Sequence, residues 1–436
     1  MTTQPPLGRA LAWSTVASGL SRVIGAVGGV FAAHALNPAG RGDLAVLVVL
    51  SAIGSIVSAA GLQFWITREV ARTGSVAVGA AVALRHSLIV AGGFVALAVV
   101  AGPFLVGPVL PLNAYVATVA SAATGSMALA ALALPNGTRS MGVFAIAMTT
   151  SSAAYAIGVG ALLVLGTGDV AAILWCGALG NLVSIAVVLR WFRLRTEPRD
   201  ISRRERAAEW RRGLRFGLPG GIGELVLFGM LRVDLLVLAA LRPAAEVGAY
   251  AIATSLTEML WIIADASAHV ALPTAADTNG QHAGTPLTAM FRVAMAVGVL
   301  SAVVLSLFAR PIIDRLFGPG YAEGAAAVPY LALAAILGGG WKILSAEVMA
   351  GHGTRARLTS AGAGIVVMIT ADFVLIPSHG VRGAGMAAAL GYFAAAALMV
   401  GVWSQTTGRS GRELLGLRRN DLAGLALRHG PEGART

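Results

Sequence analysis

Long apolar segments constrain the fold of this chain more than any other feature. About twelve can be recognised, each long enough to cross the hydrocarbon core of a bilayer, which takes about 20 apolar residues in a helix. They lie at 11–36, 42–67, 86–110, 112–134, 140–166, 168–192, 216–240, 247–272, 287–309, 325–349, 357–377 and 382–404. Because a segment in lipid must satisfy its own backbone polar groups, we expect each to be a helix. The sequence therefore predicts an all-α, polytopic membrane protein.

The composition supports this class. The chain of 436 residues is 57% hydrophobic and only 12% charged, with a mean hydropathy of +0.78. A soluble chain carries about twice that charged fraction. The first apolar segment is too long for the core of a cleavable signal peptide, so we expect it to remain as a membrane span. A single cysteine, Cys176, excludes an intrachain disulfide, and we expect this thiol to be inert packing.

The net charge of +12 does not indicate nucleic-acid binding, because the arginines cluster in the loops and ends between apolar segments. Ten lie between Arg190 and Arg215, and six between Arg409 and Arg435. With the N-terminus in the cytoplasm, cytoplasmic loops and ends hold 23 arginines and outer loops hold five. The positive-inside rule then predicts a multi-pass membrane protein with both termini in the cytoplasm.

A short motif occurs twice at about half the chain length. The first copy, "ALNPAGRG", begins at Ala35, and the second, "ALRPAAEVG", begins at Ala240, so that the offset is 205 residues (240 − 35). Each follows an apolar segment and opens the next, on the same side of the membrane. This pattern predicts two six-helix lobes related by a parallel repeat, 1–192 and 216–404.

Between the predicted lobes lies a basic cytoplasmic connector, 193–215, and after them a tail, 405–436. In the connector, Ala207, Trp210 and Leu214 share one helical face. The tail similarly alternates leucines with arginines. Both patterns are typical of amphipathic helices at a membrane surface.

Arg22 lies near the middle of the first apolar segment, roughly 16 Å into it at the helical rise. A charge at that depth costs from about 3 to well above 10 kcal/mol. On a helical wheel Arg22 shares a narrow arc with Ser14, Ser18, Gly25 and Gly29, opposite bulky apolar residues. We expect Arg22 to point into the helix bundle, either in a structural ion pair or in a cavity that binds substrate.

The second half carries further charges within its apolar segments. Glu258, Asp265 and His269 fall on one face of the segment 247–272, while Arg232 and the only lysine, Lys342, lie in other segments. Two carboxylates on one helix in hydrocarbon need compensation. Either Arg232 or Lys342 neutralises them, or at least one binds a proton or Na⁺ during a transport cycle.

Three more acids lie within apolar segments: Glu224, Asp234 and Asp372. Asp372 is near the outer end of its segment, where we expect it to reach the membrane surface. The acids thus outnumber Arg22, Arg232 and Lys342.

Catalytic motifs are absent from the sequence. There is no G-x-x-x-x-G-K-[ST] loop, no H-E-x-x-H, no paired cysteines and no G-x-S-x-G. We therefore predict a protein that is not an enzyme, with no catalytic residues, no metal site and no cofactor.

Several stretches resemble the polysaccharide flippase branch of the superfamily of multidrug, oligosaccharidyl-lipid and polysaccharide exporters. They are "AAHALNPAGRGDLAVL", "DLLVLAALRPAAEVGAYAIATSLTEML" and "VLIPSHGVRGAGMAAALGYF". In addition, "SRVIGAVGGVFAAHAL" is similar to the first span of lipid II flippases, in which an arginine at the position of Arg22 faces a central cavity. Lipid II flippases typically have fourteen spans, whereas this chain has about twelve.

The resemblance implies a MATE-like fold (that of the multidrug branch) and a transporter that works by alternating access. Its substrate would be a polyprenyl-diphosphate-linked oligosaccharide, moved from the cytoplasmic to the outer leaflet for cell-surface polysaccharide synthesis. Arg22, Arg232 and Lys342 would bind the anionic diphosphate. Glu258 and Asp265 would couple transport to an H⁺ or Na⁺ gradient, with the membrane potential as a further driving force.

We expect this transporter to function as a monomer in the bilayer. The acidic surplus leaves an alternative open, a cation-coupled multidrug antiporter of the same superfamily. A membrane scaffold without transport activity is a third possibility.

Overall fold

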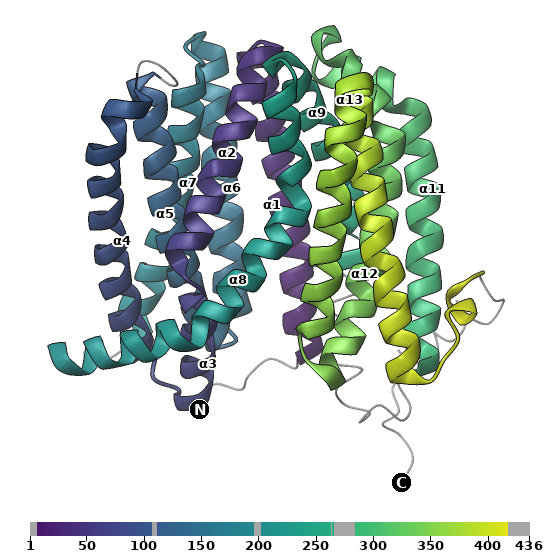
Figure 1. Ribbon diagram of the computed structural model, residues 1–436. Coiled ribbons are helices and arrows are strands. Elements are labelled where there is room, and N and C mark those ends of the chain that lie inside the picture. The colour runs from purple at the N-terminus through teal and green to yellow at the C-terminus, as the bar shows by residue number, and fades with distance from the viewer. Residues whose placement is uncertain (1–6, 107–110, 196–201, 263, 266–283, 417–436) are drawn as a thin grey trace. The chain divides into compact units, whose positions relative to one another are not determined.

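The structure of the protein is a computed structural model, which describes residues 7–106, 111–195, 202–262, 264–265 and 284–416 (Figure 1). Eight helices of the described residues are long and apolar enough to cross a membrane, and one of these is 53 residues long. This confirms the predicted all-α, polytopic membrane protein. The longer helices are α1 (Leu7–Ala35), α2 (Pro38–Ala59), α3 (Leu62–Thr73), α4 (Val76–Leu105), α5 (Leu112–Gly137), α6 (Met141–Leu165), α7 (Val170–Arg195), α8 (Arg203–Leu241), α9 (Ala244–Thr257), α11 (Gly284–Leu316), α12 (Val328–His352) and α13 (Arg355–Thr407).

The second predicted segment, 42–67, ends earlier than expected. Helix α2 stops at Ala59 because Ala60 (φ 49°) and Gly61 (φ 70°) adopt left-handed backbone conformations. The chain then continues as α3, a separate short helix that buries Leu62 and Trp65. The prediction of one span through residue 67 was therefore wrong at its end.

The eighth predicted segment, 247–272, is not one continuous α-helix in its described part. Helix α9 ends at Thr257, and Glu258–Leu260 form a 3₁₀ turn before the chain resumes helical structure. A 3₁₀ turn within a helix often marks a functional hinge or a strained sequence. His269, predicted to share a face with Glu258, lies outside the described residues.

Helices α4 and α5 correspond to the third and fourth predicted segments, 86–110 and 112–134. Helix α4 begins at Val76, ten residues (86 − 76) before its predicted start, and ends at Leu105, while α5 begins at Leu112. Residues 107–110, the last four of the third predicted segment, lie outside the described residues.

The chain divides into two compact units. The first comprises Met1–Phe228 with Pro243–Gly248, and the second comprises Gly229–Arg242 with Ala249–Thr436. The division falls inside α8, whereas the lobes predicted from the sequence were divided at the connector 193–215.

In the first unit, α1 packs along α6, and the small Gly28 allows the ring of Tyr155 to approach the α1 backbone. Parts of α1, α2, α5, α6 and α7 share one apolar core, and α3 to α7 share another. The first part of α8, drawn in teal, lies at a steep angle to α4 and α5 (Figure 1). Trp210 of that part packs against the second core and donates from Nε1 to Nδ1 of His86 at 3.4 Å.

The two copies of the repeated motif contact each other within the first unit. A Cβ on Gly42 would collide with the carbonyl oxygen of Ala244, and a Cβ on Gly248 would collide with that of Pro38. Backbones at this distance leave no room for a side chain, so glycine is required at both positions. The repeated motif therefore forms a reciprocal contact.

In the second unit, α12 packs on both α11 and α13. Helix α13 reverses direction at Gly380 (φ 53°, ψ −131°), so it supplies both the eleventh and the twelfth predicted segment. Its two halves, drawn in yellow-green and yellow, lie side by side (Figure 1). Gly364 and Gly391 make this close packing possible, because a Cβ on either would lie 2.8 Å from the carbonyl oxygen of the other.

Candidate functional site: charged pairs and two cavities

Arg232 and Glu258 form an ion pair in the second unit. Arg232 lies on α8, and Glu258 opens the 3₁₀ turn that follows α9. The distance from Nη1 of Arg232 to Oε1 of Glu258 is 2.5 Å, and the two side chains are 27% and 32% exposed. The pair is therefore half-buried, so that polar ligands can still reach it.

Lys342 of α12 forms a second ion pair, with Asp265. Its Nζ lies 2.8 Å from Oδ1 of Asp265 and 4.0 Å from the centre of the Trp261 ring. Trp261 is fixed in turn, because its Nε1 donates to the carbonyl oxygen of Ala335 at 2.9 Å. Lys342 is thus held by a carboxylate and an aromatic face together.

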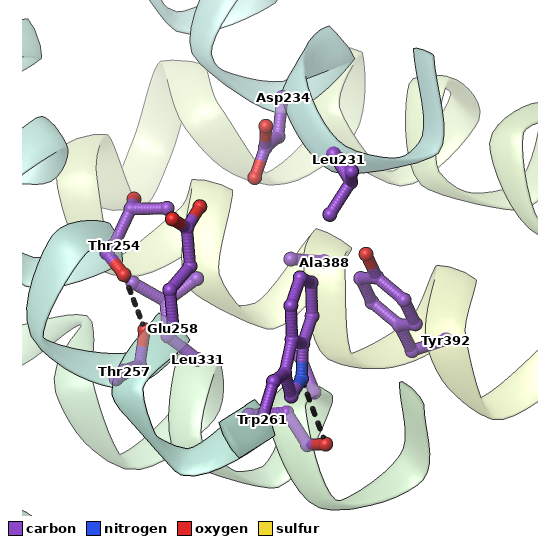
Figure 2. A pocket seen from close by; sticks show the side chains of 11 residues that line it. Leu231, Asp234, Thr254, Thr257, Glu258, Trp261, Leu331, Ala388 and Tyr392 are labelled. Atoms are coloured by element: carbon purple, nitrogen blue, oxygen red, sulfur yellow. Dashed lines mark hydrogen bonds between the residues drawn. The ribbon is translucent and has the colours of Figure 1, made fainter. Parts of the chain in front are cut away.

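A small cavity lies beside these pairs, with about 320 Å³ of empty space. Figure 2 shows the carboxylates of Asp234 and Glu258, the indole of Trp261 and the hydroxyl of Tyr392 grouped around it. The remaining lining residues are apolar or threonine: Leu231, Thr254, Thr257, Leu331, Ala334, Ala335 and Ala388.

Asp234 and Asp372 are the most deeply buried acids near this cavity. Asp234 accepts hydrogen bonds from the hydroxyl of Tyr250 and, at 2.7 Å, from the backbone N–H of Leu235. Asp372 is 0% exposed, and neither of its carboxylate oxygens has a hydrogen-bond partner among the described residues. The expectation that Asp372 reaches the membrane surface was therefore wrong, because α13 packs this position inside the unit.

Arg22 belongs to the first unit, whereas the other four predicted site residues, Arg232, Lys342, Glu258 and Asp265, lie together in the second. The structure places the Arg22 side chain on an exposed face of α1. On the same face, an added Cβ at Gly25 or Gly29 would meet no heavy atom within 4 Å. The face of α1 that packs on α6 is a neighbouring one, where Ser21 and Ser152 share a 2.7 Å hydrogen bond.

A larger cavity, with about 1230 Å³ of empty space, lies within the first unit. Sequence reasoning missed it, although polar residues at helical spacing were visible. They are Ser51 and Ser55 on α2, Ser121 on α5, and Asn181 and Ser184 on α7. The only acid among the described lining residues is Glu224, whose Oε2 accepts from Nε2 of Gln63 at 2.6 Å.

Within the described part of the chain, no group of three or more His, Cys, Asp or Glu residues could hold a metal ion. The expected absence of metal and cofactor sites stays a prediction for the chain as a whole.

Comparison with known proteins indicates the family. A sequence model described as "Polysaccharide biosynthesis protein" matches residues 7–279, more than half of the 436 residues. No curated protein is similar enough in sequence to match. The family match confirms the resemblance inferred from the sequence motifs.

Solved structures with the same fold come from more than one branch of transporters. The inward-facing conformation of a multidrug resistance MATE family transporter of the MOP superfamily has a TM-score of 0.74 at 16% identity, covering 89% of this chain and 94% of that one. Lipid II flippase MurJ, in an inward closed conformation, has a TM-score of 0.71 at 13% identity, covering 96% and 93%. A MOP superfamily transporter from Pyrococcus furiosus, whose binding pocket is described as having reverse polarity, has a TM-score of 0.66 at 16% identity, covering 92% and 95%. The chain therefore belongs to the polysaccharide biosynthesis protein family and has the fold shared by MATE transporters and a lipid II flippase.

Proposed function

We propose that this protein is a flippase for a polyprenyl-diphosphate-linked oligosaccharide, serving cell-surface polysaccharide synthesis. It moves its substrate from the cytoplasmic to the outer leaflet of a bacterial plasma membrane by alternating access, as a monomer with both termini in the cytoplasm. The family match supports the pathway, and the fold supports transport. The arginine distribution supports the orientation.

The observation that carries this proposal is the pair of accessible cations, Arg232 and Lys342, each held by a carboxylate. A diphosphate group entering a low-dielectric site needs cationic partners, and guanidinium and ammonium groups both bind phosphate oxygens. Because both ion pairs are only partly buried, an incoming diphosphate can compete with Glu258 and Asp265 for the cations. The acids keep the cations neutralised while no substrate is bound.

Arg22 supplies a third cation, on the exposed face of α1. The tight packing of α1 on α6 uses a different face of α1, so a substitution at Arg22 leaves that packing in place. Outward movement of an anion is also favoured by an inside-negative membrane potential, by about 2.3 kcal/mol per charge per 100 mV.

Coupling to a cation gradient would operate through the same acids. When the diphosphate takes Arg232 or Lys342, Glu258 or Asp265 is released and needs a new counter-charge, which a proton or Na⁺ can supply. The 3₁₀ turn at Glu258–Leu260 gives these acids a backbone that can move.

Reconstitution tests the proposal. Vesicles containing the purified protein and a fluorescent polyprenyl-diphosphate oligosaccharide should move the lipid between leaflets, and a deletion strain should accumulate the lipid on the cytoplasmic side. Arg22→Ala should abolish this movement at normal protein abundance, and Arg22→Lys should retain part of it. Arg72→Ala, which removes an exposed arginine of α3, is the matched control and should transport normally.

Normal transport by Arg22→Ala would refute the role of that residue, and loss of the protein from the membrane would indicate a structural ion pair instead. Absence of lipid movement by the unaltered protein would refute the flippase.

One observation favours a second candidate, a cation-coupled multidrug antiporter. After Arg232 and Lys342 are paired, Glu224, Asp234 and Asp372 form no ion pair within the described residues. A surplus of acids without a cationic partner suits a cationic substrate. Uptake of ethidium by the same vesicles, without movement of the lipid-linked sugar, would decide for the antiporter.

A further inference from the structure

The large cavity of the first unit differs in chemistry from the charged site of the second. Its described lining contains no arginine or lysine, and Glu224 is its only charged residue. A diphosphate would find no cation there and would face a carboxylate. The cavity is therefore not suited to the anionic part of the proposed substrate.

Three serine hydroxyls of the lining present acceptor oxygens, because their protons are already used in hydrogen bonds to backbone carbonyls. Ser51 donates to the carbonyl oxygen of Thr118 at 3.2 Å, Ser55 to that of Ala122 at 3.0 Å, and Ser121 to that of Leu174 at 3.0 Å. A hydroxyl oxygen that has donated its proton keeps lone pairs for a ligand. The cavity wall is thus rich in hydrogen-bond acceptors.

Ser184 has both a donor and an acceptor to offer. It lines the cavity, is 2% exposed, and its Oγ has no hydrogen-bond partner among the described residues. Leaving a buried hydroxyl unsatisfied costs about 1–3 kcal/mol, so this side chain favours a ligand that bonds to it. A ligand hydroxyl can both donate and accept, whereas a quaternary ammonium ion can do neither.

Gly125 keeps space beside these polar groups. A Cβ at this position would collide with Oγ of Ser55 and lie 3.6 Å from Nδ2 of Asn181. The amide of Asn181 is held by a 3.3 Å hydrogen bond from Nδ2 to Oγ1 of Thr124. The remaining wall is largely apolar, as in most small-molecule sites, where a few placed polar groups set specificity.

We infer that this cavity binds the sugar portion of the lipid-linked substrate, through the hydroxyls of an uncharged pyranose. This inference rests on the proposed flippase function and adds a separate binding site for the glycan in the first unit. Ser184, Asn181 and the acceptor oxygens of Ser51, Ser55 and Ser121 bond to sugar hydroxyls. Glu224 accepts a further sugar proton beside its bond from Gln63.

Because the chain has a single cysteine, the inference can be tested directly by protection of an introduced thiol from labelling. In a Cys176→Ala background, Ser151→Cys places one reporter thiol in the cavity lining, and Ala71→Cys on the exposed side of α3 serves as a reference. The full-length protein is labelled with a small methanethiosulfonate. The probes are farnesyl diphosphate alone and farnesyl diphosphate carrying glucose, galactose or N-acetylglucosamine.

At least one sugar-bearing probe should slow labelling of Ser151→Cys by threefold or more relative to farnesyl diphosphate, without affecting Ala71→Cys. This sugar-dependent protection should disappear in Ser184→Ala and in Asn181→Leu. The matched control is Ser126→Ala, since Ser126 is also a buried serine without a partner in the described residues but does not line the cavity. It should leave the protection intact.

Equal protection by farnesyl diphosphate with and without sugar would overturn the inference, as would protection by tetraphenylphosphonium but by no sugar-bearing probe. Persistence of the effect in both Ser184→Ala and Asn181→Leu would also overturn it. The reconstituted transport assay separates the two proposals. Sugar-dependent protection without lipid movement would refute only the flippase, and lipid movement without sugar-dependent protection would refute only the glycan site.

Discussion

The two cavities of this protein accommodate polar groups among apolar helices in different ways. In the first unit, polar groups line a large cavity as hydroxyls that bond to carbonyl oxygens of their own or neighbouring helices. In the second unit, a small cavity is flanked by full charges that neutralise one another in pairs. Both units place polar chemistry among apolar helices.

The difference shows how the cost of a polar group depends on its partner. A serine in a helix can donate to the carbonyl one turn earlier, so it needs no residue from elsewhere. A charged side chain needs an opposite charge placed by another element, and losing that partner leaves a buried charge uncompensated. Substitutions should therefore be far more disruptive in the second unit than in the first.

The largest effect is expected for Arg232→Ala. Removing this arginine leaves Glu258 half-buried without its cation, which should lower the free energy of unfolding by about 3 kcal/mol, at the lower end for buried pairs because both side chains are partly exposed. Denaturant unfolding of the purified protein in detergent measures it. The double variant Arg232→Ala/Glu258→Gln should recover at least half of the loss. A double variant as unstable as the single one would show that the pair is not the cause.

A smaller loss, of about 2 kcal/mol, is expected for Lys342→Met. The methionine keeps most of the length of the side chain but removes the ion pair with Asp265 and the cation–π contact with the Trp261 ring. Lys342→Arg should be much milder, because it retains the positive charge. The same unfolding measurement applies. Equal losses in the two variants would indicate that the fit of the lysine, and not its charge, stabilises the site.

Asp372→Asn should raise the free energy of unfolding, in contrast to the two variants above. Asp372 is fully buried without a partner in the described residues, so a neutral amide should raise the free energy of unfolding, by about 1 kcal/mol. A decrease in stability would mean that Asp372 holds a bound cation in the unaltered protein.

The smallest effect is expected for Glu224→Gln in the first unit. The amide oxygen of a glutamine can still accept the hydrogen bond from Nε2 of Gln63, so stability should change by less than about 0.5 kcal/mol. Glu224→Leu removes the acceptor and should cost about 1 kcal/mol. If Glu224→Gln matched Arg232→Ala in its effect, the contrast between the two units would fail.

The helices could be predicted from the sequence because their signal is local. Each predicted segment that falls on described residues is helical, since apolar length and the need to satisfy the backbone act within one segment. Two details depended on contacts from elsewhere. Helix α2 stops after Ala59, where the left-handed Ala60 and Gly61 pack against the α8 backbone at Gly217. The 3₁₀ turn begins at Glu258, whose side chain pairs with Arg232.

The sequence indicated which charged residues form the site, but not how they pair with one another. Charged residues in apolar segments singled out Arg232, Lys342, Glu258 and Asp265, and neutralisation of the acids by the two cations was one of the alternatives considered. Which acid pairs with which cation depends on helix packing, which no sequence spacing specifies. Asp372 was misread because distance along a span does not reveal which face a neighbouring helix covers. Their roles in substrate binding and ion coupling stay predictions.

The reciprocal contact of the repeated motif has a consequence for how such chains diverge. Gly42 lies against Ala244, and Gly248 against Pro38, although the two stretches are about 205 residues apart. A larger residue in one stretch can be accommodated only if the opposite backbone shifts. Among relatives, changes at these positions should therefore arise in matched pairs, and a chimera that joins halves from two distant relatives should fail first at this contact.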